Sequence, residues 1–157
     1  MAGEDFDELA TEIRVRRECG QVWIKRLALG RSTTEQAEAR ADAFVTSLGL
    51  APISWHDMSR NGAHAGAASI LHRDLAYDVE IMPATDALRL SKDFFGYFEE
   101  QDDDDGQQCR YFTNGTLIEP SRRNGRSWSG ITSATFDCGV IVVAKDSIGI
   151  LWVSDED

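Results

Sequence analysis

The chain has 157 residues, of which 42% are hydrophobic and 27% are charged, a composition typical of one globular domain. Its 27 acidic residues outnumber 16 lysines and arginines, which gives a formal net charge of −11. Nucleic acids and anionic membranes recruit lysine and arginine, so this charge argues against direct binding to either of them. It favours a protein partner with a basic surface.

The sequence shows neither a targeting segment nor a membrane-spanning segment. Residues 1–7 carry acids and lack the basic and apolar regions of a signal peptide. No apolar run approaches the ~18 residues that a transmembrane helix requires. Cys19, Cys109 and Cys138 are too widely spaced to form a CxxC pair. We therefore expect a cytoplasmic protein with reduced thiols.

Apolar residues recur at helical spacing in the first two thirds of the chain. This spacing predicts helices over residues 4–18, 32–48, 59–74 and 85–100. Ser32 and Glu35 match a capping box at the start of the second of these helices, and Gly49 follows its end. Residues 22–29 fit either a helix or a strand, because periodicity alone does not separate the two.

After Gln107 the apolar residues alternate and are interrupted by turn dipeptides, which predicts antiparallel strands. The expected strands cover residues 110–113, 116–119, 128–136, 140–144 and 148–153. Asn114-Gly115 predicts a hairpin between the first two strands. The last two strands are nearly continuous apolar runs, which indicates burial on both faces. We therefore predict one α+β domain over residues 1–157, with about four helices (about 1–106) packed on a C-terminal meander (about 107–154).

Two fragments resemble known sites but fail on inspection. Residues 72–75 read His-Arg-Asp-Leu, like the start of a protein-kinase catalytic loop, yet Val79 stands where the metal-binding Asn is required. The acidic run before Gly106 resembles a calcium loop. Aligning that glycine with the invariant one puts Phe112 at the position of the bidentate Glu. Neither fragment predicts an active site.

Three histidines, His56, His64 and His72, recur every eight residues. On a helix this spacing rotates each one by about 80° from the next, so the three do not share a face as metal ligands do. Their imidazoles, with Asp74 and Asp78, are the residues that an enzyme would have to use. We predict no bound metal, no cofactor and no catalytic activity.

The acidic stretch near residue 100 is the strongest candidate for a binding site. Seven acids fall from Asp93 to Asp105, and six of them directly follow a run of aromatic residues. Carboxylates that steer a partner, together with aromatic anchors, are typical of protein-binding surfaces. The predicted partner-binding residues are Tyr97, Phe98, Glu99, Glu100, Asp102, Asp103, Asp104 and Asp105. A solvated loop after a helix would also explain the acidic run.

Residues 135–141 (TFDCGVI) and 148–157 resemble the C-terminal ends of bacterial immunity proteins that are paired with polymorphic, contact-dependent or type VI secreted toxins. The resemblance covers about a quarter of the chain. It implies a small cytosolic protein that binds a cognate toxin and blocks its active site. Many such toxins are nucleases with basic clefts, which suits an acidic inhibitor.

Two other functions use the same features. A phage-encoded nucleic-acid mimic would occupy the nucleic-acid channel of a host defence complex, and it would spread carboxylates over an extended face. An uncharacterised small enzyme would depend on the three histidines with Asp74 and Asp78. The concentration of acids after Asp93 favours a local protein-binding surface over mimicry.

Overall fold

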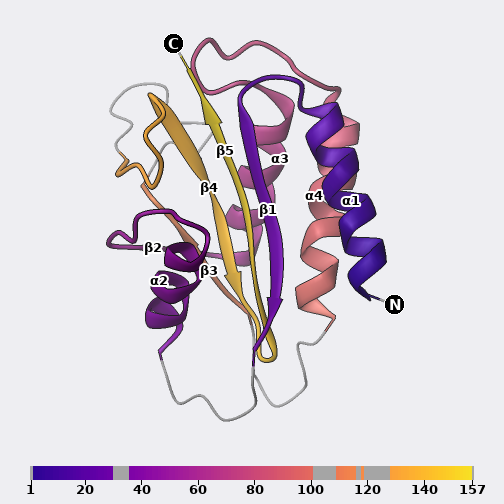
Figure 1. The fold of residues 1–157 in the computed structure, drawn as a ribbon. Helices are drawn as coiled ribbons and strands as arrows, with labels where there is room; N and C mark the ends of the chain where they lie inside the picture. Colours follow the sequence, from indigo (N-terminus) through magenta and orange to yellow (C-terminus); the bar gives the residue numbers. More distant parts are fainter. Residues whose placement is uncertain (1, 30–35, 101–108, 116–117, 119–127, 157) are drawn as a thin grey trace.

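The computed structural model describes residues 2–29, 36–100, 109–115, 118 and 128–156 (Figure 1). Four helices and five strands follow one another within these residues. In chain order they are α1 (Ala2–Arg16), β1 (Gln21–Ala28), α2 (Ala37–Ser47), β2 (His56–Met58), α3 (Arg60–His72), α4 (Ala84–Glu99), β3 (Arg110–Thr113), β4 (Phe136–Val143) and β5 (Ser147–Asp155). No helix of the described segments is long and apolar enough to cross a membrane.

The strands form one antiparallel sheet in the order β1-β5-β4-β3-β2. The predicted α+β fold class is therefore confirmed. The sheet does not come from the C-terminal third alone, because β1 and β2 precede Gln107. The ambiguous segment 22–29 lies in a strand, since β1 pairs with β5 along its full length, from Gln21 opposite Ser154 to Ala28 opposite Ser147.

Helices cover both faces of the sheet (Figure 1). Apolar side chains of α1, α3 and α4 share one core cluster with one face, including Ile13, Leu71 and Phe94. Phe44 and Val45 of α2 pack on the opposite face. Every residue of β5 is buried, and so is every residue of β4 after Phe136. The prediction that these strands are central and covered on both faces is confirmed.

The predicted hairpin at Asn114-Gly115 is wrong. Both edges of β3 are occupied, one by β2 and the other by β4, so β3 has no free edge for a hairpin partner. Residues 116, 117 and 119 of the predicted second strand lie outside the described residues. Gly115 instead forms an isolated bridge to Trp128. The buried Asn114 amide donates to the carbonyl oxygens of Ser129 (2.9 Å) and Asp137 (2.8 Å). Asn114, which the sequence suggested as a hairpin turn residue, thus binds the backbone at Ser129 and Asp137.

Two further boundaries differ from the sequence prediction. Helix α2 begins at Ala37 with Gln36 as its N-cap, and the predicted capping residues Ser32 and Glu35 lie outside the described residues. Of the strand predicted over residues 128–136, only Phe136 belongs to β4. The fully buried carboxylate of Asp137 holds this region instead, because it accepts hydrogen bonds from the Ile131 and Thr132 amides.

Candidate functional site

Phe98, one of the predicted anchors, belongs to the core. Its side chain is fully buried, and its ring lies 5.2 Å from the ring of Phe94 and 6.4 Å from that of Phe6. It faces the sheet at Gly149, where an added Cβ would collide with the Phe98 ring. Phe98 therefore cannot anchor a partner, because the amphipathic register of α4 turns it inward.

Glu99 is also directed into the protein. Its side chain is 8% exposed and accepts hydrogen bonds from Arg60 Nη2 (3.0 Å), from His64 Nε2 (2.7 Å) and from the Tyr111 hydroxyl. The carboxylate thus joins the end of α4 to α3 and β3, and it is not available to a partner. Glu100 is exposed. Residues Asp102, Asp103, Asp104 and Asp105 lie outside the described residues.

Tyr97 is half-buried at the surface between α1 and α4. Its ring meets that of Phe6 edge-on at 5.2 Å, and the Arg26 guanidinium lies 5.9 Å from its centroid. Burial raises the pKa of Tyr97, and the nearby carboxylates of Asp5 and Asp93 raise it further. Carboxylates therefore do lie near Tyr97, but they are those of Asp5 in α1 and Asp93 in α4, and neither belongs to the predicted partner-binding residues.

The five residues that an enzyme would use are spread over different elements. His56 is exposed on β2, and His64 contacts Glu99 while stacking on Phe95. The Nδ1 atom of His72 lies 2.7 Å from the carbonyl oxygen of Met82. Asp74 and Asp78 belong to the turn between α3 and α4. Within the described ranges, no group of three or more His, Cys, Asp or Glu side chains could hold a metal ion.

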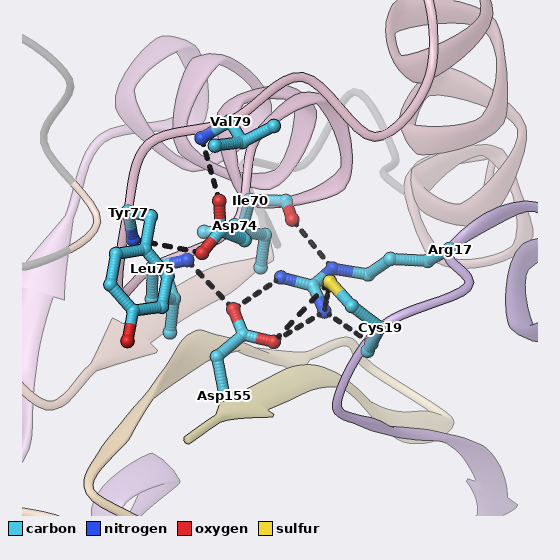
Figure 2. Close-up of polar contacts among 8 residues, drawn as sticks. All are labelled: Arg17, Cys19, Ile70, Asp74, Leu75, Tyr77, Val79 and Asp155. Atoms are coloured by element: carbon cyan, nitrogen blue, oxygen red, sulfur yellow. Dashed lines mark hydrogen bonds and ion pairs between the residues drawn. The ribbon is translucent and has the colours of Figure 1, made fainter. Parts of the chain in front are cut away.

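A second surface lies at the end of the sheet where β5 ends. A buried ion pair between Arg17 and Asp155 supports it from below (Figure 2). Arg17 Nη1 donates to Asp155 Oδ1 at 2.9 Å, and Nη2 donates to Oδ2 at 2.8 Å. Both residues are nearly inaccessible, with 2% and 3% exposed. Arg17 Nε and Nη1 also donate to the carbonyl oxygens of Ile70 (2.8 Å) and Cys19 (2.9 Å). One guanidinium thus joins α1, α3 and β5.

The ionised form of Asp155 is stabilised by these donors. Burial alone would raise its pKa, but the hydrogen bonds and charge of Arg17 outweigh burial. The Leu75 amide adds a third donor at 2.7 Å from Oδ2. The pKa of Asp155 is consequently below its usual value, as expected of a carboxylate with several donors.

Cys19 lies beside this pair. Its sulfur is 3.7 Å from both Arg17 Nη1 and Asp155 Oδ1. Burial raises the pKa of the thiol, Arg17 lowers it, and Asp155 raises it again, with a net increase. Since the thiolate is the nucleophile, the raised pKa favours the protonated, less nucleophilic form of Cys19.

Residues 73–81, which we call the display turn, arch over the ion pair between α3 and α4 (Figures 1 and 2). The backbone of Asp74 donates to Val79 O at 3.0 Å, and the Asp74 carboxylate accepts from the amides of Tyr77 (2.8 Å) and Val79 (2.6 Å). Arg73 Nη1 donates to the carbonyl oxygen of Asp78, which has a φ of 57°. Aspartate tolerates this left-handed conformation better than most residues. The turn is therefore fixed by its own side chains.

The tip of the display turn exposes apolar side chains. Tyr77 is 64% exposed and Val79 is 61% exposed. Next to them is a cavity of about 590 Å³, whose lining includes Cys19, Ile81 and Asp155. This volume falls in the range of ordinary ligand and side-chain pockets. The surface thus combines projecting apolar groups with a hollow beside them.

Carboxylates surround this hollow. We call Glu18, Asp78, Glu80 and Glu156 the acidic rim: Asp78 is on the turn, and the other three line the cavity. All four are exposed. Among the described residues, Glu18, Asp78 and Glu156 enter no ion pair, and Glu80 lies 3.9 Å from His72 Nε2. The rim can therefore offer carboxylates outside ion pairs to a basic surface, although Arg73 of the same turn lies next to Asp78.

Sequence reasoning missed this surface because its parts are far apart in the chain. Glu18, residues 77–80 and Glu156 are brought together by tertiary contacts, among them the Arg17–Asp155 pair and the hydrogen bond from Leu75 to Asp155. The one available signal was the acidic C-terminus next to an apolar strand.

Comparison with protein-family models, curated proteins and solved structures gave no match. The functional assignment accordingly depends on the geometry of the chain itself.

Proposed function

We propose that this chain is a non-catalytic, acidic binding protein that acts as an immunity protein and neutralises a cognate bacterial toxin by covering its active-site cleft. The observation that carries the proposal is the display turn. Its exposed Tyr77 and Val79 side chains line the same hollow as carboxylates of the acidic rim. Binding energy in protein interfaces concentrates in rigid aromatic and apolar anchors, while charges around them steer association. Glu100 and Asp102 to Asp105 form the alternative contact surface.

Mimicry of a nucleic acid is less well supported, because arginines interrupt the acidic face of α1 and α4. Arg16 pairs with Asp86, and Arg89 pairs with Glu12 at 2.6 Å and with Asp93 at 3.6 Å. A phosphate-like array requires carboxylates that stay unpaired over an extended surface. Because these arginines neutralise part of the negative charge on α1 and α4, only local acidic patches remain there. Such patches suit contact with a protein.

The proposal is tested with any toxin domain that is found to be encoded beside the gene of this chain. The purified proteins are expected to form a 1:1 complex, and one equivalent of this chain should abolish the toxin's activity and restore growth of cells that produce it. Full toxin activity with a molar excess of this chain would contradict the proposal. Inhibition of a purified host defence complex, with no effect on any neighbouring toxin, would favour mimicry instead.

A further inference from the structure

We infer that the display turn is the element that enters the partner's cleft, with Tyr77 and Val79 as anchors and the acidic rim facing lysines and arginines at the cleft's edge. This inference rests on the proposed function and specifies its surface. The occupant is a basic protein, not a membrane and not a nucleic acid, because the rim would repel both.

The pairing of exposed apolar residues is the first observation. The described large apolar side chains with high exposure are Val15, Leu27, Tyr77, Val79 and Leu88. Single exposed apolar residues are common on soluble proteins and need no partner. Tyr77 and Val79 differ from the others because they are two residues apart on the tip of one turn. Both side chains also line the hollow beside the turn.

Preorganisation is the second observation. Two amides of the turn are held by Asp74, and a third, that of Leu75, is held by the buried Asp155 (Figure 2). The base of the turn is closed by an isolated antiparallel β-bridge between the backbones of Arg73 and Glu80. A loop that is already ordered loses little conformational entropy when it binds, so its exposed side chains keep more of their interaction energy.

Charge complementarity determines the kind of partner. Three of the four rim carboxylates enter no ion pair among the described residues, and the Asp155 charge beneath them is already compensated by Arg17. These three carboxylates thus carry no paired cation within the described part of the chain. A partner cleft bordered by lysine or arginine would be attracted to the rim, and an acidic cleft would be rejected.

The cavity beside the turn indicates which partner side chain fits. An arginine or lysine carries an apolar stem with a charged end. Its stem would lie against Val79 and Ile81, while its charge would reach Glu18 or Glu156. The exposed Tyr77 ring would add a cation–π contact. A basic residue next to an apolar pocket is therefore the partner chemistry that this surface matches.

Substitutions at the tip test the inference with the same toxin domain. Tyr77→Ala and Val79→Ala should each weaken binding at least about tenfold, mainly through faster dissociation. Tyr77→Phe should bind nearly as well as the original chain, because it keeps the ring. Leu88→Ala and Val15→Ala are matched controls at other exposed apolar positions and should leave affinity unchanged. Inhibition that is equally strong with Tyr77→Ala and Val79→Ala would overturn the inference while leaving the proposed function intact.

A titration without the toxin separates the two proposals. The probe is a capped five-residue peptide of alternating leucine and arginine, and its control carries glutamate in place of arginine. NMR shifts from the arginine peptide should be saturable and should map to Glu18, Tyr77, Val79 and Glu156, and Tyr77→Ala should remove them. Such mapping would support the surface even if no toxin bound. Shifts that centre on Tyr97 and Glu100, or no saturable shifts, would overturn it.

Discussion

Arg17 and Asp155, 138 residues apart in the sequence, form a two-pronged ion pair beneath the display turn. The same carboxylate accepts from the Leu75 amide at the start of that turn. The pair therefore fixes the end of α1 against the last strand and supports the turn that we assign to binding. The same two side chains thus join distant parts of the fold and support the turn that we propose as the binding element.

Removing one partner of this ion pair should destabilise the fold strongly. Asp155→Asn leaves the buried Arg17 charge uncompensated, and Arg17→Met leaves the buried Asp155 charge uncompensated. Each change should lower the free energy of unfolding by about 3–5 kcal/mol. Urea denaturation measures the loss. Glu156→Gln, at the neighbouring exposed position, should change stability by no more than about 0.5 kcal/mol. The double variant Arg17→Met/Asp155→Leu should lose less than the sum of its single changes.

The ion pair also predicts a specific pH dependence. The pKa of Asp155 is lowered by folding, so its contribution is present above the unfolded pKa of about 3.9 and is lost as pH falls through the lower folded pKa. The stability difference between the original chain and Asp155→Asn should therefore be constant above about pH 5 and shrink below pH 4. Urea midpoints between pH 2 and pH 7 provide the measurement. A difference that persists unchanged at the acidic end would contradict the role assigned to Arg17.

Cys19 should behave as a shielded thiol. Because burial raises its pKa, the rate of alkylation by iodoacetamide should rise with pH along a curve displaced to higher pH than that of a free cysteine. Mass spectrometry of the Cys19 peptide follows the reaction. In Asp155→Asn the curve should move to lower pH, since the carboxylate raises the thiol's pKa. A curve that matches a free cysteine would show that the thiol is open to solvent.

The contact between Gly149 and Phe98 should be intolerant of added volume. A Cβ at Gly149 would overlap the fully buried Phe98 ring, so Gly149→Ala should cost roughly 1–3 kcal/mol of stability. Combining it with Phe98→Leu should recover part of that loss, since the smaller side chain makes room. Thermal unfolding of the two single variants and the double variant tests this coupling. Purely additive losses would refute the proposed overlap.

The sequence predicted the helices well because each carries a continuous apolar stripe that local periodicity reveals. It left residues 22–29 undecided and missed β2, since both become strands only by pairing with segments far along the chain. The Asn114-Gly115 signal misled for the same reason. The Asn-Gly dipeptide favours a hairpin turn, but β3 lies between β2 and β4 in the sheet and has no free edge for a hairpin partner.

The candidate site was harder to predict than the fold. Composition indicated an acidic binding surface, and Tyr97 and Glu100 do lie near the protein surface. Periodicity within α4 could have shown that Phe98 points inward. It could not have shown that Glu99 meets Arg60 and His64, or that Glu18, Tyr77 and Glu156 converge, because those contacts depend on tertiary structure.

Steering of a basic partner onto the display turn is the role that we assign to the acidic rim. Its most direct test is the association rate with the toxin domain across a salt series, for two variants that each lose four charges. The rim variant carries Glu18→Gln, Asp78→Asn, Glu80→Gln and Glu156→Gln, and the control variant carries Asn at positions 102 to 105.

Steering by exposed charges is screened over ~10 Å at 0.1 M salt, so charges at the contact surface should dominate it. The rim variant should therefore associate several-fold more slowly with a flattened salt dependence, at nearly unchanged thermal stability, and the control variant should change less. If the rim variant matches the original chain while the control variant is slowed, the partner binds the acidic run after α4, and the display turn is not the binding surface.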